Sequence, residues 1–123
     1  MEFFVVAHII RNEVWIQENI NIASMPNYCP SIAVNTQADD TARIDTIWGE
    51  FEVQRQSISG GVRFALTTCP NALAWTITTG YRPAPEHIVI HCTINRIESG
   101  EDFVESIEEF VQEWKEGLEA QAA

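Results

Sequence analysis

Residues 99–118 read SGEDFVESIEEFVQEWKEGL, and their pattern predicts a long amphipathic helix. At about 100° per residue, its large apolar side chains fall within an arc of roughly 120° on one face of a helix. They are Phe103, Val104, Ile107, Phe110, Val111, Trp114 and Leu118. Ser99 and Asp102 resemble a capping box at the start of this helix, although Glu or Gln is usual at the second position. An apolar stripe of this size must be covered by the rest of the chain.

The rest of the chain has the pattern of β-strands, because its apolar residues mostly recur with a period of two. Strands are expected at residues 3–11, 14–22, 32–34, 47–54, 62–67, 73–78 and 87–95. Short connections favour antiparallel neighbours, and 123 residues suit one domain. The sequence therefore predicts a single α+β domain, 1–123. It would be an antiparallel β-meander or roll of about six to seven strands, packed against one C-terminal amphipathic helix.

This order of elements resembles that of pleckstrin-homology-like domains, which have a seven-stranded roll followed by a C-terminal helix. The resemblance concerns element order only. Members of that superfamily that bind phosphoinositides use basic residues around the first hairpin. Here Arg11, Asn12 and Glu13 form the expected first turn, with one base and one acid. The resemblance therefore implies no lipid binding.

Three expected strands carry an apolar side chain where a polar one is usual. The strand at residues 3–11 is apolar on both faces, as in a strand that is covered on both sides. Trp15 and Trp48 each lie on the otherwise polar face of their expected strands. A large aromatic side chain on a polar face suggests a patch or a pocket. The alternatives are a covering helix or loop, or a one-residue slip of the face.

The charge of the chain limits its partners. The formal net charge is −11, from 18 acidic and 7 basic residues. A nucleic-acid-binding surface needs a basic footprint, and anionic membranes attract basic segments. We therefore expect neither nucleic acid nor membrane as a partner. The longest apolar run has about eight residues, against the roughly 20 that a membrane-spanning helix needs.

The cysteines and the first residues indicate a cytoplasmic protein. Met1 and Glu2 lack the basic start of a secretory signal. Cys29, Cys69 and Cys92 are an odd number without metal-type spacing, which is typical of reduced thiols. A bridge between Cys29 and Cys69 is the alternative, since both lie in expected loops.

Few residues point to chemistry. His87 and His91 share one face of an expected strand but lie about 13 Å apart, too far for one metal ion. Glu50 and Glu52 share a face and are about 7 Å apart, a spacing that suits acid–base catalysis or a plain solvated surface. No phosphate loop, nucleophile elbow or calcium loop is present. We expect no cofactor and no metal, and an enzyme is the third-ranked hypothesis.

The acidic helix and the two tryptophans give the leading functional hypotheses. Residues 98–123 carry nine acidic residues and one basic residue, a net charge of −8. The first hypothesis is a non-catalytic interaction domain that binds a basic protein or a second copy through this helix or the Trp-bearing sheet face. Its partner-binding candidates are Glu105, Glu108, Glu109, Glu113 and Glu116. The alternative is a pocket for a small apolar or aromatic ligand between sheet and helix, lined by Trp15, Trp48, Tyr81, His87 and His91.

Overall fold

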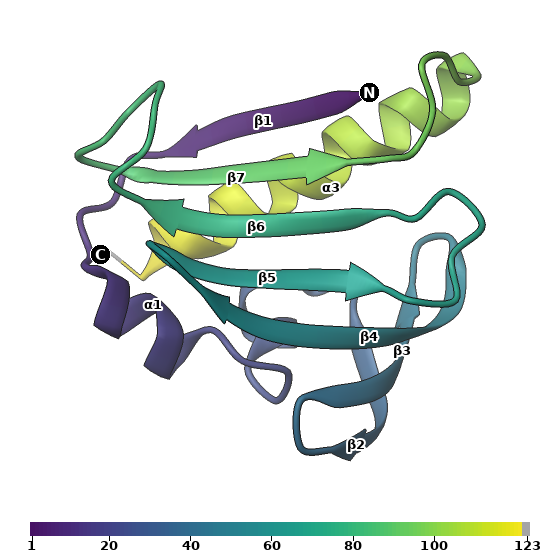
Figure 1. The fold of residues 1–123 in the computed structure, drawn as a ribbon, viewed down its shortest axis with the longest axis horizontal. Coiled ribbons are helices and arrows are strands. Elements are labelled where there is room, and N and C mark those ends of the chain that lie inside the picture. Colours follow the sequence, from purple (N-terminus) through teal and green to yellow (C-terminus); the bar gives the residue numbers. More distant parts are fainter. Residues whose placement is uncertain (122–123) are drawn as a thin grey trace.

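Seven antiparallel strands form a single sheet in the computed structural model, which describes residues 1–121 (Figure 1). The strands are β1 (Glu2–Ala7), β2 (Ala33–Ala38), β3 (Thr41–Thr46), β4 (Gly49–Ile58), β5 (Gly61–Leu66), β6 (Ala74–Thr79) and β7 (Ile88–Thr93). The helices are α1 (Glu13–Asn19), α2 (Met25–Tyr28) and α3 (Glu101–Ala120). The order across the sheet is β1-β7-β6-β5-β4-β3-β2. The predicted α+β class, with an antiparallel sheet and a C-terminal helix, is confirmed.

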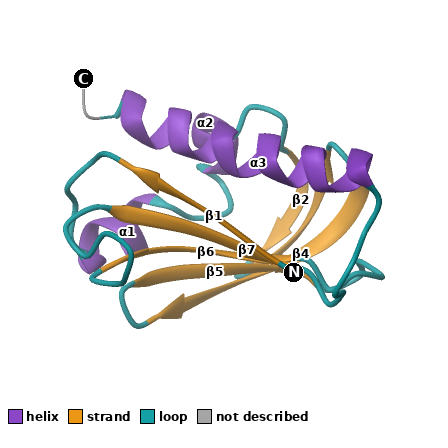
Figure 2. Cartoon of the chain, turned by 90° about the horizontal axis from the view of Figure 1, so that it is seen from above, coloured by secondary structure: helices purple, strands orange, loops and turns teal. Residues whose placement is uncertain are grey.

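The helix α3 lies across one face of the sheet, which we call the inner face, and Figure 2 shows α2 beside it. We call the opposite face of the sheet the outer face. No described helix combines the length and the apolar character needed to cross a membrane.

The layer between the sheet and α3 is filled by aromatic side chains. Trp75 and Phe64 point inward from β6 and β5, and Trp114 and Phe110 meet them from α3. The ring centroids of Trp75 lie 5.3 Å from Phe64, 5.0 Å from Phe110 and 6.3 Å from Trp114. All four side chains are at most 1 % exposed. Rings at these separations add to stability beyond the area that they bury.

The predicted faces are confirmed for the last three strands. Alternate residues of β5, β6 and β7 point into the core, because successive side chains of a strand lie on opposite faces. The inward residues are Val62, Phe64, Leu66, Trp75, Ile77, Ile88, Ile90 and Cys92. The turn at Gly60 is also confirmed, since its φ of 88° lies in the left-handed region that favours glycine.

The predicted strand at residues 14–22 is wrong, because Glu13–Asn19 form α1. The side-chain oxygen of Asn12 accepts a hydrogen bond from the backbone N–H of Trp15 at 2.8 Å and caps this helix. Ile16 and Ile20 are buried four positions apart, as on one face of a helix. Because α1 and α2 lie between the first two strands, the order of elements differs from the seven strands followed by one helix on which the resemblance to pleckstrin-homology-like domains rested.

The region between residues 32 and 50 also differs from the prediction. β2 extends to Ala38, and β3 is an additional strand that was not predicted from the sequence. Trp48 lies in the turn between β3 and β4 rather than in a strand. At the other end of the chain, Gly100 is the N-cap of α3, so the predicted capping box of Ser99 and Asp102 is wrong.

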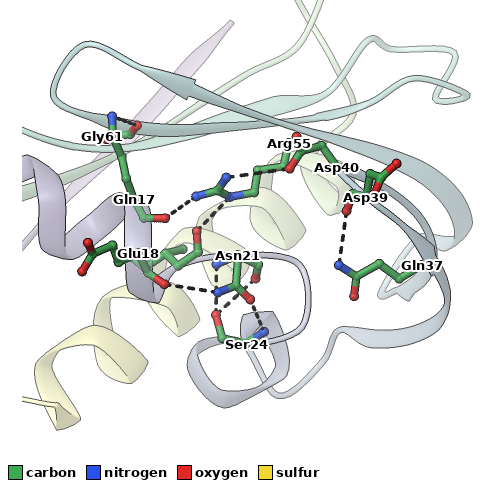
Figure 3. Close-up of polar contacts among 10 residues, drawn as sticks. Gln17, Glu18, Asn21, Ser24, Gln37, Asp39, Asp40, Arg55 and Gly61 are labelled. Atoms are coloured by element: carbon green, nitrogen blue, oxygen red, sulfur yellow. Dashed lines mark hydrogen bonds and ion pairs between the residues drawn. The ribbon is translucent and has the colours of Figure 1, made fainter.

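The side chain of Arg55 fixes α1 to the sheet (Figure 3). Its guanidinium donates to the carbonyl oxygens of Gln17 at 2.5 Å and Ile20 at 3.0 Å. These carbonyls belong to the end of α1, where helix carbonyls lack partners and attract a positive charge. The Gln17 amide in turn donates to the carbonyls of Ile58 and Gly61 at 3.1 and 3.2 Å. The helix α1 is thereby held at the end of the β4–β5 hairpin.

The C-terminal half of α3 is bound to β1. Lys115 Nζ donates to the carbonyl oxygen of Val6 at 3.0 Å and to Glu119 Oε2 at 2.6 Å. The backbone N–H of His8 donates to the same carboxylate at 2.8 Å. These hydrogen bonds, from Lys115 first, lower the pKa of Glu119. A backbone carbonyl of β1, which lies at the edge of the sheet, thus accepts a hydrogen bond from a lysine.

The helices α2 and α3 touch at Gly117. A Cβ at this position would overlap the backbone carbonyl group of Tyr28, so only glycine permits the observed approach. The Glu113 carboxylate, one turn earlier, accepts hydrogen bonds from the backbone N–H of Ser31 at 2.7 Å and from its hydroxyl at 2.8 Å. The segment after α2 is therefore fixed to α3.

We predict that Gly117→Ala destabilises the protein by about 1–3 kcal/mol, because the new methyl group forces α2 away from α3. Gly100→Ala is the matched control, since a Cβ there meets open space. The control should cost no more than about 1 kcal/mol, the usual difference at a helix N-cap. Urea unfolding followed by Trp fluorescence measures both, and equal losses would contradict the close contact.

Candidate functional site

The outer face of the sheet has no helix against it in residues 1–121, and Figure 1 looks onto this face with α3 behind. Neighbouring residues on it form rows across β1, β7 and β6. One row joins Phe4 and His91 to Thr76, and the next joins Val6 and Val89 to Thr78. The Phe4 side chain is 58 % exposed. Apolar residues of β1 therefore face solvent, so the prediction that this strand is covered on both sides is wrong for the single chain.

A hollow of about 560 Å³, which we call the outer hollow, lies on this face. Its lining comes from β1, β6, β7, the β4–β5 hairpin and the β6–β7 loop. The lining residues are Glu2, Phe4, Ile58, Ser59, Thr76, Thr78, Tyr81, Arg82, Pro83, Val89 and His91. Val89 and Thr78 are only 5 % and 8 % exposed, because the surrounding side chains shield the bottom of the hollow.

The wall formed by the β6–β7 loop is tied to the neighbouring hairpin. The Tyr81 hydroxyl donates to the carbonyl oxygen of Ser59 at 3.1 Å. A Cβ on Gly60 would lie 2.5 Å from the Tyr81 ring, so glycine at this turn lets the ring lie close to the hairpin. The wall of the hollow is thus formed before any ligand binds, which lowers the entropic cost of binding.

The two ends of the outer hollow carry opposite charges. At the end where β1 begins, His91 Nε2 lies 3.2 Å from Glu2 Oε1. Arg82 lies at the other end, in the loop between β6 and β7, and the structure of residues 1–121 shows no side-chain hydrogen bond or ion pair for it. An arginine of this kind offers a free guanidinium to a carboxylate.

The structure brings together two of the five predicted ligand-binding residues. Tyr81 and His91 both line the outer hollow. Trp15 lies on α1 at a separate shallow surface, with the Arg11 guanidinium 5.1 Å from its ring centroid. His87 packs edge-on against His8, with ring centroids 5.2 Å apart.

Trp48 is covered by α3. Its indole N–H donates to the hydroxyl of Ser106 at 2.8 Å, and its ring centroid lies 5.0 Å from that of Phe110. Trp48 lies in a turn and Trp15 lies on α1, so the two tryptophans do not share one face of the sheet. In the described residues the layer between sheet and α3 is filled by the aromatic cluster, and the hollow that Tyr81 and His91 line lies on the other face of the sheet.

Four of the five predicted partner-binding residues are exposed on α3, and one is not free. Glu113 is partly buried and accepts the two hydrogen bonds from Ser31. The exposed ones are Glu105, Glu108, Glu109 and Glu116. Their role in binding a basic partner stays a prediction.

The paired carboxylates on β4 are engaged with neighbouring side chains. Arg43 donates to Glu50 at 2.8 Å and holds the pKa of that carboxyl below its usual range. The Glu52 carboxylate accepts a hydrogen bond from Thr67 at 2.9 Å. Within residues 1–121, no group of three or more His, Cys, Asp or Glu residues could hold a metal ion.

All three cysteines are free thiols, so the alternative of a Cys29–Cys69 bridge is wrong. Burial raises the pKa of Cys29 and of Cys92 to about 12. Cys69 is partly exposed. A buried thiol with such a pKa is a poor nucleophile, because the thiolate is the reactive form.

The outer hollow therefore combines apolar walls, the hydroxyls of Thr76 and Thr78, and opposite charges at its two ends. This arrangement suits binding, since small numbers of polar groups on an apolar lining give orientation and specificity. The outer hollow was not predicted from the sequence. The one feature of the sequence that pointed to it is the apolar outer side of β1. No protein-family model matches the chain, and no curated protein matches it in sequence.

We predict that a disulfide reagent at pH 8 labels Cys69 first. With a pKa of about 12, only about one in 10,000 molecules carries a thiolate at Cys29 or Cys92. The native protein should show one faster-reacting thiol and the unfolded protein three. Cys69→Ser should remove the faster phase. A fast phase that survives this substitution would instead make a buried cysteine reactive.

Proposed function

We propose that this chain is a non-catalytic interaction domain that binds a partner through the outer face of its sheet. The observation that carries the proposal is the exposure of large apolar side chains around the outer hollow. Phe4 is 58 % exposed and Tyr81 is 46 % exposed. Exposed apolar groups that gather on one face mark interaction sites more often than scattered ones do.

The composition of β1 supports the same surface. Strands that are apolar on both faces normally lie between two covering layers. The inner sides of β1 and β7 already pack against α3 and the core. Phe4, Val6 and Val89 on the outer side have no covering layer within residues 1–121. A bound partner would supply the second layer that this composition favours.

The distribution of charge supports it further. The chain has a net charge of −11, and residues 98–123 account for −8 of it. The lining of the outer hollow contains one acid, Glu2, and one arginine, Arg82, in addition to His91. A partner on the outer face avoids the acidic surface of α3. A basic partner on α3 is the weaker alternative, because a solvated acidic face also serves solubility.

We predict that a photo-crosslinking residue in place of Phe4, introduced in the cells that make the protein, gives a discrete adduct. Ile97 is the matched control, since it is apolar and 93 % exposed but lies outside the hollow. Thr76→Arg should remove the Phe4 adduct by placing a charge on the bottom of the hollow. Equal adducts at Phe4 and Ile97, or none at Phe4, would contradict the proposal.

A small apolar or aromatic molecule in the outer hollow is the second candidate function. The volume of about 560 Å³ favours it, because small-molecule sites measure roughly 300–1,000 Å³. We predict that, on this alternative, native mass spectrometry shows a monomer with a constant extra mass that Thr76→Arg removes. A bare mass from wild-type protein purified from its own cells would count against the alternative.

A further inference from the structure

We infer that the partner on the outer face is a second copy of this chain, related to the first by a two-fold axis through the outer hollow. This inference rests on the proposed function and names the partner. It comes from the way the charged and apolar residues of the hollow are ordered along the strands.

Opposite charges stand at the two ends of the outer hollow, with apolar residues between them. Glu2 begins β1, and Arg82 lies in the β6–β7 loop, which Figure 1 shows at the opposite end of the face. From Glu2 to Val6 the strand rises by about 13 Å, and the β6–β7 loop lies beyond the row of Val6 and Val89. Phe4 occupies the middle of this span.

A two-fold axis requires a self-complementary surface, because residue i then faces residue j while j faces i. An axis between the charged ends would pass near Phe4 and Val89. It would place Glu2 of each copy opposite Arg82 of the other, so that two ion pairs flank an apolar centre. The order of charges on the outer face therefore suits an isologous pair.

Electrostatics also favour this face for contact between copies. Two chains with a net charge of −11 repel each other, and the repulsion is smallest where like charges are absent from the contact. A contact through α3 would set Glu105 and Glu109 of one copy against the same residues of the other. A contact through the outer face keeps both acidic helices on the outside of the dimer.

The covering of β1 and β7 follows from the same arrangement. In the dimer the outer side of each β1 faces the outer hollow of the other copy, and the exposed Phe4 rings leave solvent. Both faces of β1 are then covered, as its apolar composition favours.

The test is sedimentation equilibrium of the full chain with reversed charges. We predict a dimer for the wild-type protein and at least about tenfold weaker association for Glu2→Arg or Arg82→Glu alone, since each variant sets like charges against each other twice. An equimolar mixture of the two variants should dimerise again, because in the mixed dimer both contacts join opposite charges. A merely misfolded variant would not be rescued by mixing.

The control variants are Glu105→Arg and Arg96→Glu, which change the net charge by the same amounts at exposed positions outside the hollow. They should leave the dimer in place. Circular dichroism of every variant checks that the fold is kept.

A wild-type monomer at concentrations of about 100 μM would overturn the inference, and so would a dimer that neither face variant weakens or a mixture that stays monomeric. The crosslinking experiment at Phe4 tests the proposed function separately from the dimer. A Phe4 adduct with a different protein would uphold an interaction domain and reject the second copy, whereas a Phe4 adduct of twice the chain mass supports both.

Discussion

Trp75 and Phe64 of the sheet pack against Trp114 and Phe110 of α3, and this packing holds the helix on the sheet. These rings cover the apolar stripe of α3 and join the two layers into one core. They also occupy the space in which a sheet capped by a helix could otherwise hold a ligand. With the inner face filled, the outer face is the side of the sheet that stays open to solvent in the described residues.

The outer face and α3 differ in charge and in apolar character. The helix carries most of the negative charge, which repels other acidic surfaces. The sheet carries an apolar hollow whose wall is fixed by the contact of Tyr81 with Ser59. The outer hollow and α3 lie on opposite faces of the sheet. A partner that bound the outer hollow would therefore not contact the acidic helix.

The sequence predicts the inner layer far better than the outer site, for reasons visible in single elements. The stripe of α3 and the alternation in β5 to β7 each have one dominant period, so their faces follow directly. The segment that forms α1 is ambiguous, since Val14 and Ile16 fit a strand while Ile16 and Ile20 also fit a helix. The cap at Asn12 was the available sign of a helix. The outer hollow joins β1 to β7 and to two connecting segments, and no local pattern encodes that pairing.

The pairing of β1 with β7 also bears on how the chain is made. Phe3 and Cys92 are register partners although they are 89 positions apart, so β1, which is synthesised before the other strands of this sheet, lacks its partner until β7 has followed. During that interval an apolar segment must stay unpaired, a state that invites aggregation. The β2–β6 meander has only local hairpin pairings and can form earlier. The closing step of folding is therefore a long-range one, and protection of the nascent N-terminal strand by a chaperone would matter most for this part of the protein.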